Sequence, residues 1–184
     1  MEQPPPSNRP SQPLDPVHTR APVFSPGSGS AGTPVTVETT NLPAVTPIYL
    51  GMGATRSSFE VLAQLVTDEF GTMSTVIDVP TWATTDRTHF FVLVDVYFRP
   101  LAVSAAFHVT EPDGTLRRQG RIADGGGNCL VLEEGGEGGE RHVLTGDRQG
   151  LAPGDDVVVE GRLAESADCP DGIALEVVRS APQP

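Results

Sequence analysis

The chain has 184 residues, a formal net charge of −12 and 38% hydrophobic residues, which suits one ordinary domain or two small ones. A surface of this sign repels nucleic-acid phosphates and anionic lipid headgroups, so we expect neither as a partner. The 20 glycines and 18 prolines exceed the usual share of these residues and predict many turns and few helices.

Charge is distributed unevenly along the chain. Residues 27–110 hold 7 acids and 3 arginines, whereas residues 111–184 hold 15 acids and 7 arginines. No segment approaches the roughly 20 apolar residues of a membrane span, and no charged-then-apolar export signal is present in this chain. Two interpretations stay open at this point: an intracellular protein, or an exported protein whose signal has been removed.

The N-terminal segment is rich in proline. Residues 1–26 contain eight prolines and show no apolar periodicity. Such a segment is extended and poorly ordered in general. We therefore predict a disordered tail over residues 1–22, which would also suit a spacer.

Short apolar runs separated by turns follow the tail. They predict strands at 35–39, 48–50, 59–66, 74–79, 89–97 and 102–109. The run at 59–66 could also pass as a helix. The nearly continuous apolar run at 89–97 suits a central strand covered on both faces. We expect these residues to form an immunoglobulin-like β-sandwich over residues 23–111.

Several short motifs give this first domain a resemblance. Ser25-Pro26-Gly27-Ser28-Gly29 opens it, Gly32-Thr33-Pro34-Val35-Thr36-Val37 follows, and Thr67-Asp68-Glu69-Phe70-Gly71-Thr72-Met73 leads to Val79-Pro80. In this order they resemble bacterial immunoglobulin-like modules of the IPT/TIG type. The resemblance implies a surface or secreted protein, and it favours a strand over a helix at 59–66. One departure is Asn41-Leu42-Pro43, where that family usually places a Gly-rich turn.

The second domain is expected over residues 112–181. Apolar runs predict strands at 116–122, 129–132, 141–144, 157–163 and 173–178. Five strands, with Pro153-Gly154-Asp155 before the fourth, suggest a small OB-type barrel. Val157 and Val159 share one strand face and could fill it, and Gly161 would allow a bend. The pattern is similar to small secreted bacterial domains of this barrel type, a resemblance that implies no activity.

Cys129 and Cys169 are the only cysteines and lie 40 residues apart in the second domain. We expect a disulfide, the alternative being two buried thiols. A disulfide implies an oxidising compartment, so with the resemblance we expect an extracytoplasmic location: periplasmic, cell-envelope or secreted. Two cysteines without paired histidines offer too few soft ligands, so no metal site is expected.

Other candidate sites have simpler explanations. Gly27–Gly32 matches G-x-G-x-x-G but lacks the strand-then-helix context of a dinucleotide site, so no cofactor is expected. The acids Glu133, Glu134, Glu137 and Glu140 surround glycines without calcium-loop spacing and predict a solvated hairpin tip. Asp155 and Asp156 would point to opposite strand faces, which makes a poor catalytic pair.

The remaining polar residues show no catalytic pattern. The histidines are scattered, so no catalytic residue is assigned. Trp82, Arg141 and His142 are the candidate binding surface. We expect a monomeric, non-catalytic, extracytoplasmic binding or spacer protein with a protein or glycan partner. The alternatives are a glycan- or peptide-binding accessory module that uses the barrel face, and a hydrolase whose acids these patterns do not reveal.

Overall fold

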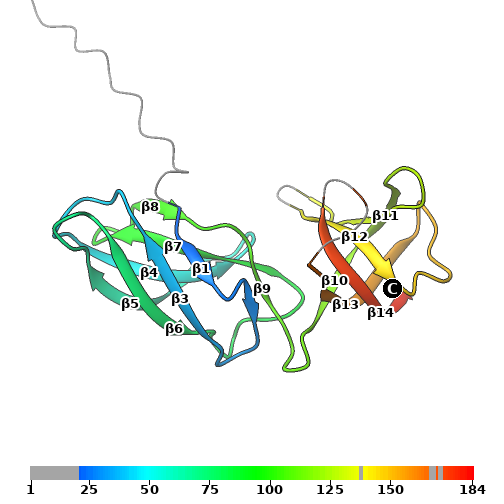
Figure 1. The fold of residues 1–184 in the computed structure, drawn as a ribbon, viewed down its shortest axis with the longest axis horizontal. Coiled ribbons are helices and arrows are strands. Elements are labelled where there is room, and N and C mark those ends of the chain that lie inside the picture. Colours follow the sequence, from blue (N-terminus) through cyan, green and yellow to red (C-terminus); the bar gives the residue numbers. More distant parts are fainter. Residues whose placement is uncertain (1–20, 137–138, 166–168, 170–171) are drawn as a thin grey trace, which may run out of the picture.

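The structure is a computed structural model that describes residues 21–136, 139–165, 169 and 172–184. The described residues form strands and turns, with an N-terminal sandwich of two sheets and a C-terminal barrel side by side (Figure 1). The all-β class predicted from the sequence is confirmed. Within these ranges there is no helix long and apolar enough to cross a membrane. Of the predicted N-terminal tail, residues 1–20 lie outside the described residues.

The sandwich has a three-stranded sheet facing a six-stranded one. The first has the order β1 (Val23–Ser25), β3 (Pro34–Thr39), β6 (Met73–Asp78). The second has the order β2 (Ser28–Gly29), β9 (Phe107–Val109), β7 (Thr88–Asp95), β4 (Pro47–Ala54), β5 (Phe59–Val66), and β8 (Pro100–Val103) pairs with β7. Residues 59–66 are therefore a strand, whereas the single strand expected at 102–109 is divided between β8 and β9.

Alternating side chains build the core between these sheets. In β3, Val35 and Val37 are fully buried while their neighbours face outward, as strand periodicity requires. Three aromatic rings, those of Phe24, Phe91 and Phe107, pack together with centroids 5.4–5.6 Å apart. Phe24 belongs to β1 and packs against this core, so the C-terminal end of the proline-rich segment 1–26 is already part of the sandwich.

The second domain is a closed five-stranded barrel. Its strands, in spatial order, are β10 (Thr115–Asp124), β11 (Leu130–Glu133), β12 (Arg141–Gly146), β14 (Ile173–Pro182) and β13 (Asp156–Leu163). Only β12 and β14 pair in parallel among the described pairs of this barrel. Val157 and Val159 lie in its apolar core, as the sequence predicts.

Two further expectations for the barrel are confirmed. The register of β13 against β14 shifts between Glu160 and Gly161, where a Cβ on Gly161 would lie 2.6 Å from the Glu176 carbonyl oxygen, so only glycine fits this bend. Cys129 and Cys169 form a disulfide with a Cα–Cα distance of 6.0 Å. A cross-link over 40 residues stabilises a domain by about 4 kcal/mol in the chain-entropy model.

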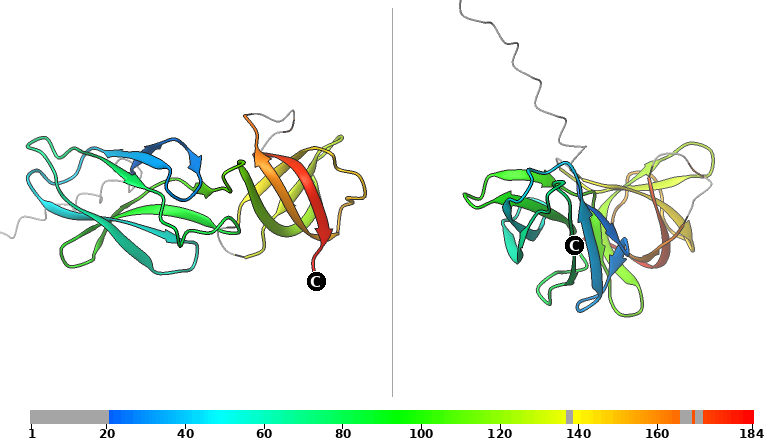
Figure 2. Two further views of the ribbon diagram at one scale, coloured as in Figure 1. Left: turned by 90° about the horizontal axis from the view of Figure 1, so that it is seen from below. Right: turned by 60° about the vertical axis from the view of Figure 1, so that its left-hand side comes forward.

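The sandwich has two distinct ends. Strand β7 begins at Thr88 beside the barrel and ends at Asp95 on the opposite side, about 23 Å away at the rise of an extended strand. β4 runs antiparallel to β7, so its first residues lie at the end away from the barrel. We call the contact with the barrel the seam and the opposite end the free tip; the left view in Figure 2 shows both.

Candidate functional site

The seam holds a group of buried polar side chains, here called the seam cluster. Thr88 and His108 come from the sandwich strands β7 and β9. The barrel supplies Arg118 from β10, His142 from β12, and Glu134 and Glu140 from the two ends of the hairpin loop between β11 and β12. The Glu134 N–H donates to the Glu140 carbonyl at 3.0 Å, which closes the hairpin and places both carboxylates beside the sandwich.

Glu140 connects the two domains directly. Its Oε2 accepts a hydrogen bond from Thr88 Oγ1 at 2.7 Å and lies 2.9 Å from His108 Nε2, which is also 3.1 Å from Oε1. The carboxylate can only accept, so His108 carries its proton on Nε2 in this contact. The Glu140 side chain keeps only 13% of its accessible surface. Hydrogen bonds from both sandwich partners therefore offset the cost of burying this charge.

Arg118 lies on the barrel side of the same contact, with a side chain that is fully buried. Its Nη1 donates to the Thr85 carbonyl across the seam at 2.6 Å and to the Arg117 carbonyl at 2.8 Å. Its Nε is 3.0 Å from Glu134 Oε1, but the N–H is not directed at that oxygen, so the contact is an ion pair without a hydrogen bond. The Arg117 backbone N–H adds a bond to the Thr85 carbonyl at 3.1 Å.

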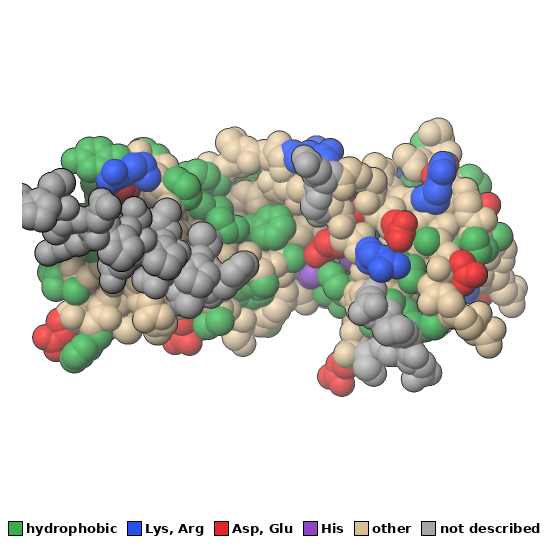
Figure 3. Space-filling model, turned by 90° about the horizontal axis from the view of Figure 1, so that it is seen from above, with side chains coloured by type: hydrophobic (Ala, Val, Ile, Leu, Met, Phe, Trp, Pro, Cys, Tyr) green, Lys and Arg blue, Asp and Glu red, His purple; other side chains and the backbone are tan. Residues whose placement is uncertain are grey.

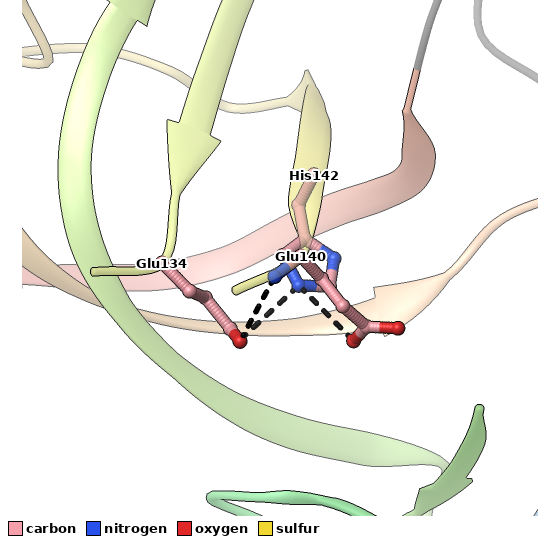
Figure 4. Close-up of side chains that lie close together, drawn as sticks. All are labelled: Glu134, Glu140 and His142. Carbon is pink, nitrogen blue, oxygen red and sulfur yellow. Dashed lines mark hydrogen bonds and ion pairs between the residues drawn. The ribbon is translucent and has the colours of Figure 1, made fainter. Parts of the chain in front are cut away.

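His142 lies against both carboxylates, as the close-up view shows (Figure 4). Its Nε2 is 3.3 Å from Glu134 Oε1 and 3.8 Å from Glu140 Oε2. One ligand-type atom from each of these three residues lies within 4.8 Å of the others. The His142 ring also packs edge-on against the His108 ring, with centroids 6.5 Å apart. Two imidazoles and two carboxylates thus converge at one place.

Burial and neighbouring charges shift the pKa values of two members of the seam cluster, Glu140 and Arg118. Burial alone would raise the pKa of Glu140, but the hydrogen bond and charge of His108, the Thr88 hydrogen bond and the charge of His142 outweigh it and lower the pKa to about 2. Burial lowers the pKa of Arg118, and the charges of Glu134 and Glu140 oppose that effect. Glu140 is therefore an anion at neutral pH, held by the opposite domain.

A hollow of about 180 Å³ between the domains reaches this cluster. Its lining includes the acids Asp86 and Glu134 and the arginines Arg56 and Arg87. Solvent and small ions can therefore approach the Glu134 side of the seam. In the space-filling view, acidic, basic and histidine side chains meet where the two domains join (Figure 3).

The residues that the sequence marks as a binding surface lie in different environments. His142 is fully buried, so it cannot form part of an exposed surface. Arg141, its neighbour on β12, faces outward and pairs with Glu133 at 3.2 Å. Trp82 is 38% exposed, with its ring 6.1 Å from the buried His89 ring. Trp82 and Arg141 remain predicted surface residues.

The solvated hairpin tip expected for the acidic loop is wrong for two of its four acids. Glu134 and Glu140 turn inward because Arg118, Thr88 and the two histidines stabilise their charges. Glu133 stays half exposed, and Glu137 lies outside the described residues. Asp155 and Asp156 have separate partners, Ala152 and Arg121, as expected for adjacent strand residues.

The sequence gives only a faint signal for the seam cluster. Strand alternation in β10 requires one of the adjacent Arg117 and Arg118 to point inward, and an inward arginine needs a carboxylate partner. Glu134 and Glu140 flank the glycine-rich turn that could supply it. His108 and Thr88 could not be connected to them, because their contact forms only when two separate domains meet.

The free tip is a second candidate site, of the opposite character. Large apolar side chains are exposed there at the end of β5 and in three neighbouring loops. They are Val45, Val66, Phe70, Val96, Tyr97 and Phe98. Phe70 and Tyr97 retain 77% and 76% of their surface, and Figure 3 shows hydrophobic side chains gathered at this end of the sandwich. An exposed apolar patch of this kind is typical of an interaction surface.

Two aspartates hold the tip loops in shape. Asp95 Oδ1 accepts backbone bonds from Tyr97 and Arg99 at 2.8 and 2.9 Å, and Asp68 Oδ1 accepts bonds from Phe70 and Thr72 at 2.9 and 2.8 Å. Each aspartate thus closes a turn that displays an aromatic residue. Side-chain and backbone hydrogen bonds from Thr72 lower the pKa of Asp68, so this turn stays charged and closed at neutral pH.

The tip aromatics are also ordered by packing against their neighbours. The Phe98 ring stacks on Tyr49 with centroids 5.4 Å apart, and the Arg99 guanidinium lies 5.3 Å from the centre of the Tyr97 ring. Val45 and Phe98 have φ angles of 48° and 59°, which side chains other than glycine rarely adopt. Strained backbone retained under exposed apolar side chains points to a role outside stability.

Comparisons with known proteins place the chain in no family. No known protein family matches it, and no curated protein is significantly similar in sequence. Among solved structures, macromomycin is similar with 17% identity and a TM-score of 0.41, over 49% of this chain and 98% of that one. Similarity at this level is too low to assign a family, a ligand or a function.

Proposed function

We propose that this chain is a non-catalytic, extracytoplasmic binding and spacer protein that presents the free tip of its sandwich to a protein partner. The observation that carries the proposal is the exposed, preorganised apolar tip. Aromatic residues and arginine are enriched in protein–protein interfaces, and Tyr97, Phe98 and Arg99 occupy one turn here. Valines are mixed with these aromatic rings at the tip. Such a surface suits the side chains of a protein partner better than a sugar, which would stack its flat face on an aromatic ring.

The barrel and the seam supply the spacer part of this proposal. The charged, hydrogen-bonded contacts of Glu140 and Arg118 hold the barrel on the end of the sandwich opposite the tip. The barrel would thus set the direction in which the tip points. The Cys129–Cys169 disulfide supports an oxidising location outside the cytoplasm.

Photo-crosslinking in the producing cells tests the binding surface. A photoreactive phenylalanine at position 98 should give one discrete protein adduct, and Tyr97→Ser should reduce that adduct about tenfold, as expected when an interface aromatic is lost. The control position is Val178 on β14, which is 48% exposed and belongs to the barrel. Equal labelling from both positions would contradict a tip-specific partner.

Three other measurements separate the alternatives. Binding to a glycan array that is lost in Tyr97→Ser would replace the protein partner with a sugar. Turnover of generic esterase or glycosidase substrates would contradict the non-catalytic assignment. Peptide mass spectrometry of non-reduced protein taken from its producing cells should recover the linked Cys129 and Cys169 peptides, and free thiols at both would contradict the extracytoplasmic location.

A further inference from the structure

We propose that the seam cluster binds one divalent metal ion of the zinc class through His142, Glu134, Glu140 and His108. This inference does not depend on the proposed function, since it concerns the opposite end of the sandwich from the tip. It rests on donor geometry, donor type, local charge and access.

The spacing of the donor atoms suits a single small ion. His142 Nε2 lies 3.3 Å from Glu134 Oε1 and 3.8 Å from Glu140 Oε2. A tetrahedral Zn²⁺ ion with bonds of about 2.0–2.2 Å holds its ligand atoms about 3.3–3.6 Å apart. His142 Nε2 therefore already lies close to the required distance from each carboxylate, whereas the two carboxylate oxygens, which lie within 4.8 Å of each other, would have to approach by up to about 1.5 Å.

The sandwich offers the fourth donor. His108 Nε2 is 2.9 Å from Glu140 Oε2, on the side of that carboxylate that faces the other domain, but it lies outside the group of three whose donor atoms are all within 4.8 Å of one another, so the His108 ring must move to reach the ion. An imidazole nitrogen must lose its proton to coordinate a metal. Binding would thus break the hydrogen bond between His108 and Glu140. The Nε2 atoms of His108 and His142 would each bond to the ion and release their protons to solvent.

The donor types select the class of metal. Two imidazoles with two carboxylates suit zinc and similar transition metals. Calcium prefers six to eight oxygen ligands, and magnesium retains several waters in an all-oxygen shell. The buried His142 and His108 fit neither of those ions.

Charge and access also favour a cation. With neutral imidazoles, the carboxylates of Glu134 and Glu140 and the guanidinium of Arg118 leave one net negative charge in a buried site. The 180 Å³ hollow through which an ion could approach is lined by Asp86 and Glu134 and also by Arg56 and Arg87, so the negative charge that attracts a cation lies in the cluster itself. Because Arg118 Nε already lies 3.0 Å from Glu134, we expect a lower affinity than at a site without a competing cation.

Metal titration of the full chain, after treatment with a chelator, tests the proposal. Co²⁺ should bind with one-to-one stoichiometry and give the intense visible absorption of a four-coordinate site, and Zn²⁺ should displace it. Glu134→Gln and His142→Gln should each weaken Zn²⁺ binding at least about tenfold, as measured by competition with a chromophoric chelator.

A matched control comes from another histidine. His89 is as buried as His142, but its Nδ1 is 3.0 Å from the Arg87 carbonyl and it lies outside the cluster, so His89→Gln should bind Zn²⁺ like the original chain. In the unaltered protein, Zn²⁺ should shift the side-chain NMR signals of His108 and His142 and leave those of His89 in place, which needs no substitution at the site.

Three results would overturn the proposal. The first is the absence of saturable Zn²⁺ binding. The second is a weak Co²⁺ spectrum typical of six-coordination. The third is equal affinity in folded Glu134→Gln and in the original chain, because a merely nearby ion would not depend on that carboxylate.

Discussion

At the seam end of the sandwich, charged groups are buried and paired, whereas at the free tip apolar side chains are exposed. Glu140 and Arg118 are covered by the contact between the domains, and their charges are matched there. Tyr97 and Phe70 face solvent, displayed by turns that two aspartates hold closed. One end of the sandwich is thus covered by the barrel, whereas the other end is the surface that we propose binds a separate molecule.

Removing the charge at the seam should have the largest effect. Glu140→Gln keeps the size of the side chain but removes the charged partner of His108 and one of the two carboxylates that oppose the burial of Arg118, and breaking a buried pair costs about 3–5 kcal/mol of unfolding free energy. Urea unfolding followed by the fluorescence of Trp82, the single tryptophan, measures it. The control is Glu69→Gln at the exposed tip, expected within about 0.5 kcal/mol of the original chain. Equal losses of unfolding free energy in Glu140→Gln and Glu69→Gln would contradict the contrast between a buried, paired charge at the seam and an exposed charge at the tip.

Acid should loosen the seam in a defined range of pH. The folded pKa of Glu140, about 2, lies below its ordinary value of 4.5, so the unfolded chain takes up this proton first as the pH falls. The contribution is complete above pH 4.5 and is lost as the pH falls toward 2, a change on the order of 3 kcal/mol. The measurement is the unfolding free energy against pH in the presence of a chelator. The difference between the original chain and Glu140→Gln should shrink over this range, and a constant difference would contradict the assignment.

Relieving backbone strain at the tip should have a smaller effect of opposite sign. Val45 is exposed, with a φ of 48°, so Val45→Gly should raise the unfolding free energy by about 1 kcal/mol. Thermal unfolding measures this gain, and Val103→Gly in strand β8 is the matched control, expected to destabilise. The same Val45→Gly change should weaken crosslinking from position 98. A destabilised Val45→Gly protein would show that this valine serves the fold and not a partner.

The sequence predicts the strands well because they depend on local patterns. Alternating Val35 and Val37 define β3, and the valines at 157 and 159 define the inner face of β13. The Cys129–Cys169 pairing also follows from the sequence, since these are the only two cysteines. Strand alternation cannot predict burial in the acidic loop, because the sequence around Glu134 and Glu140 resembles that of any solvated hairpin turn.

The sites were harder to predict because each depends on contacts between distant segments. The partners of Glu140 are Thr88 and His108, which lie 52 and 32 residues away in another domain. The tip unites the segments around Val45, Phe70 and Phe98 only after β4 has paired with both β5 and β7. Neither arrangement leaves a motif of fixed spacing.

Residual dipolar couplings in a weakly aligned medium test most directly whether the seam makes the two domains one rigid spacer. At neutral pH, amide couplings from sandwich strands such as β4 and β7 and from barrel strands such as β10 and β13 should fit a single alignment tensor, because the contacts of Glu140 and Arg118 fix one domain against the other. In Glu140→Gln, the two domains should need separate tensors. Two different tensors for the unaltered chain at neutral pH would contradict the account.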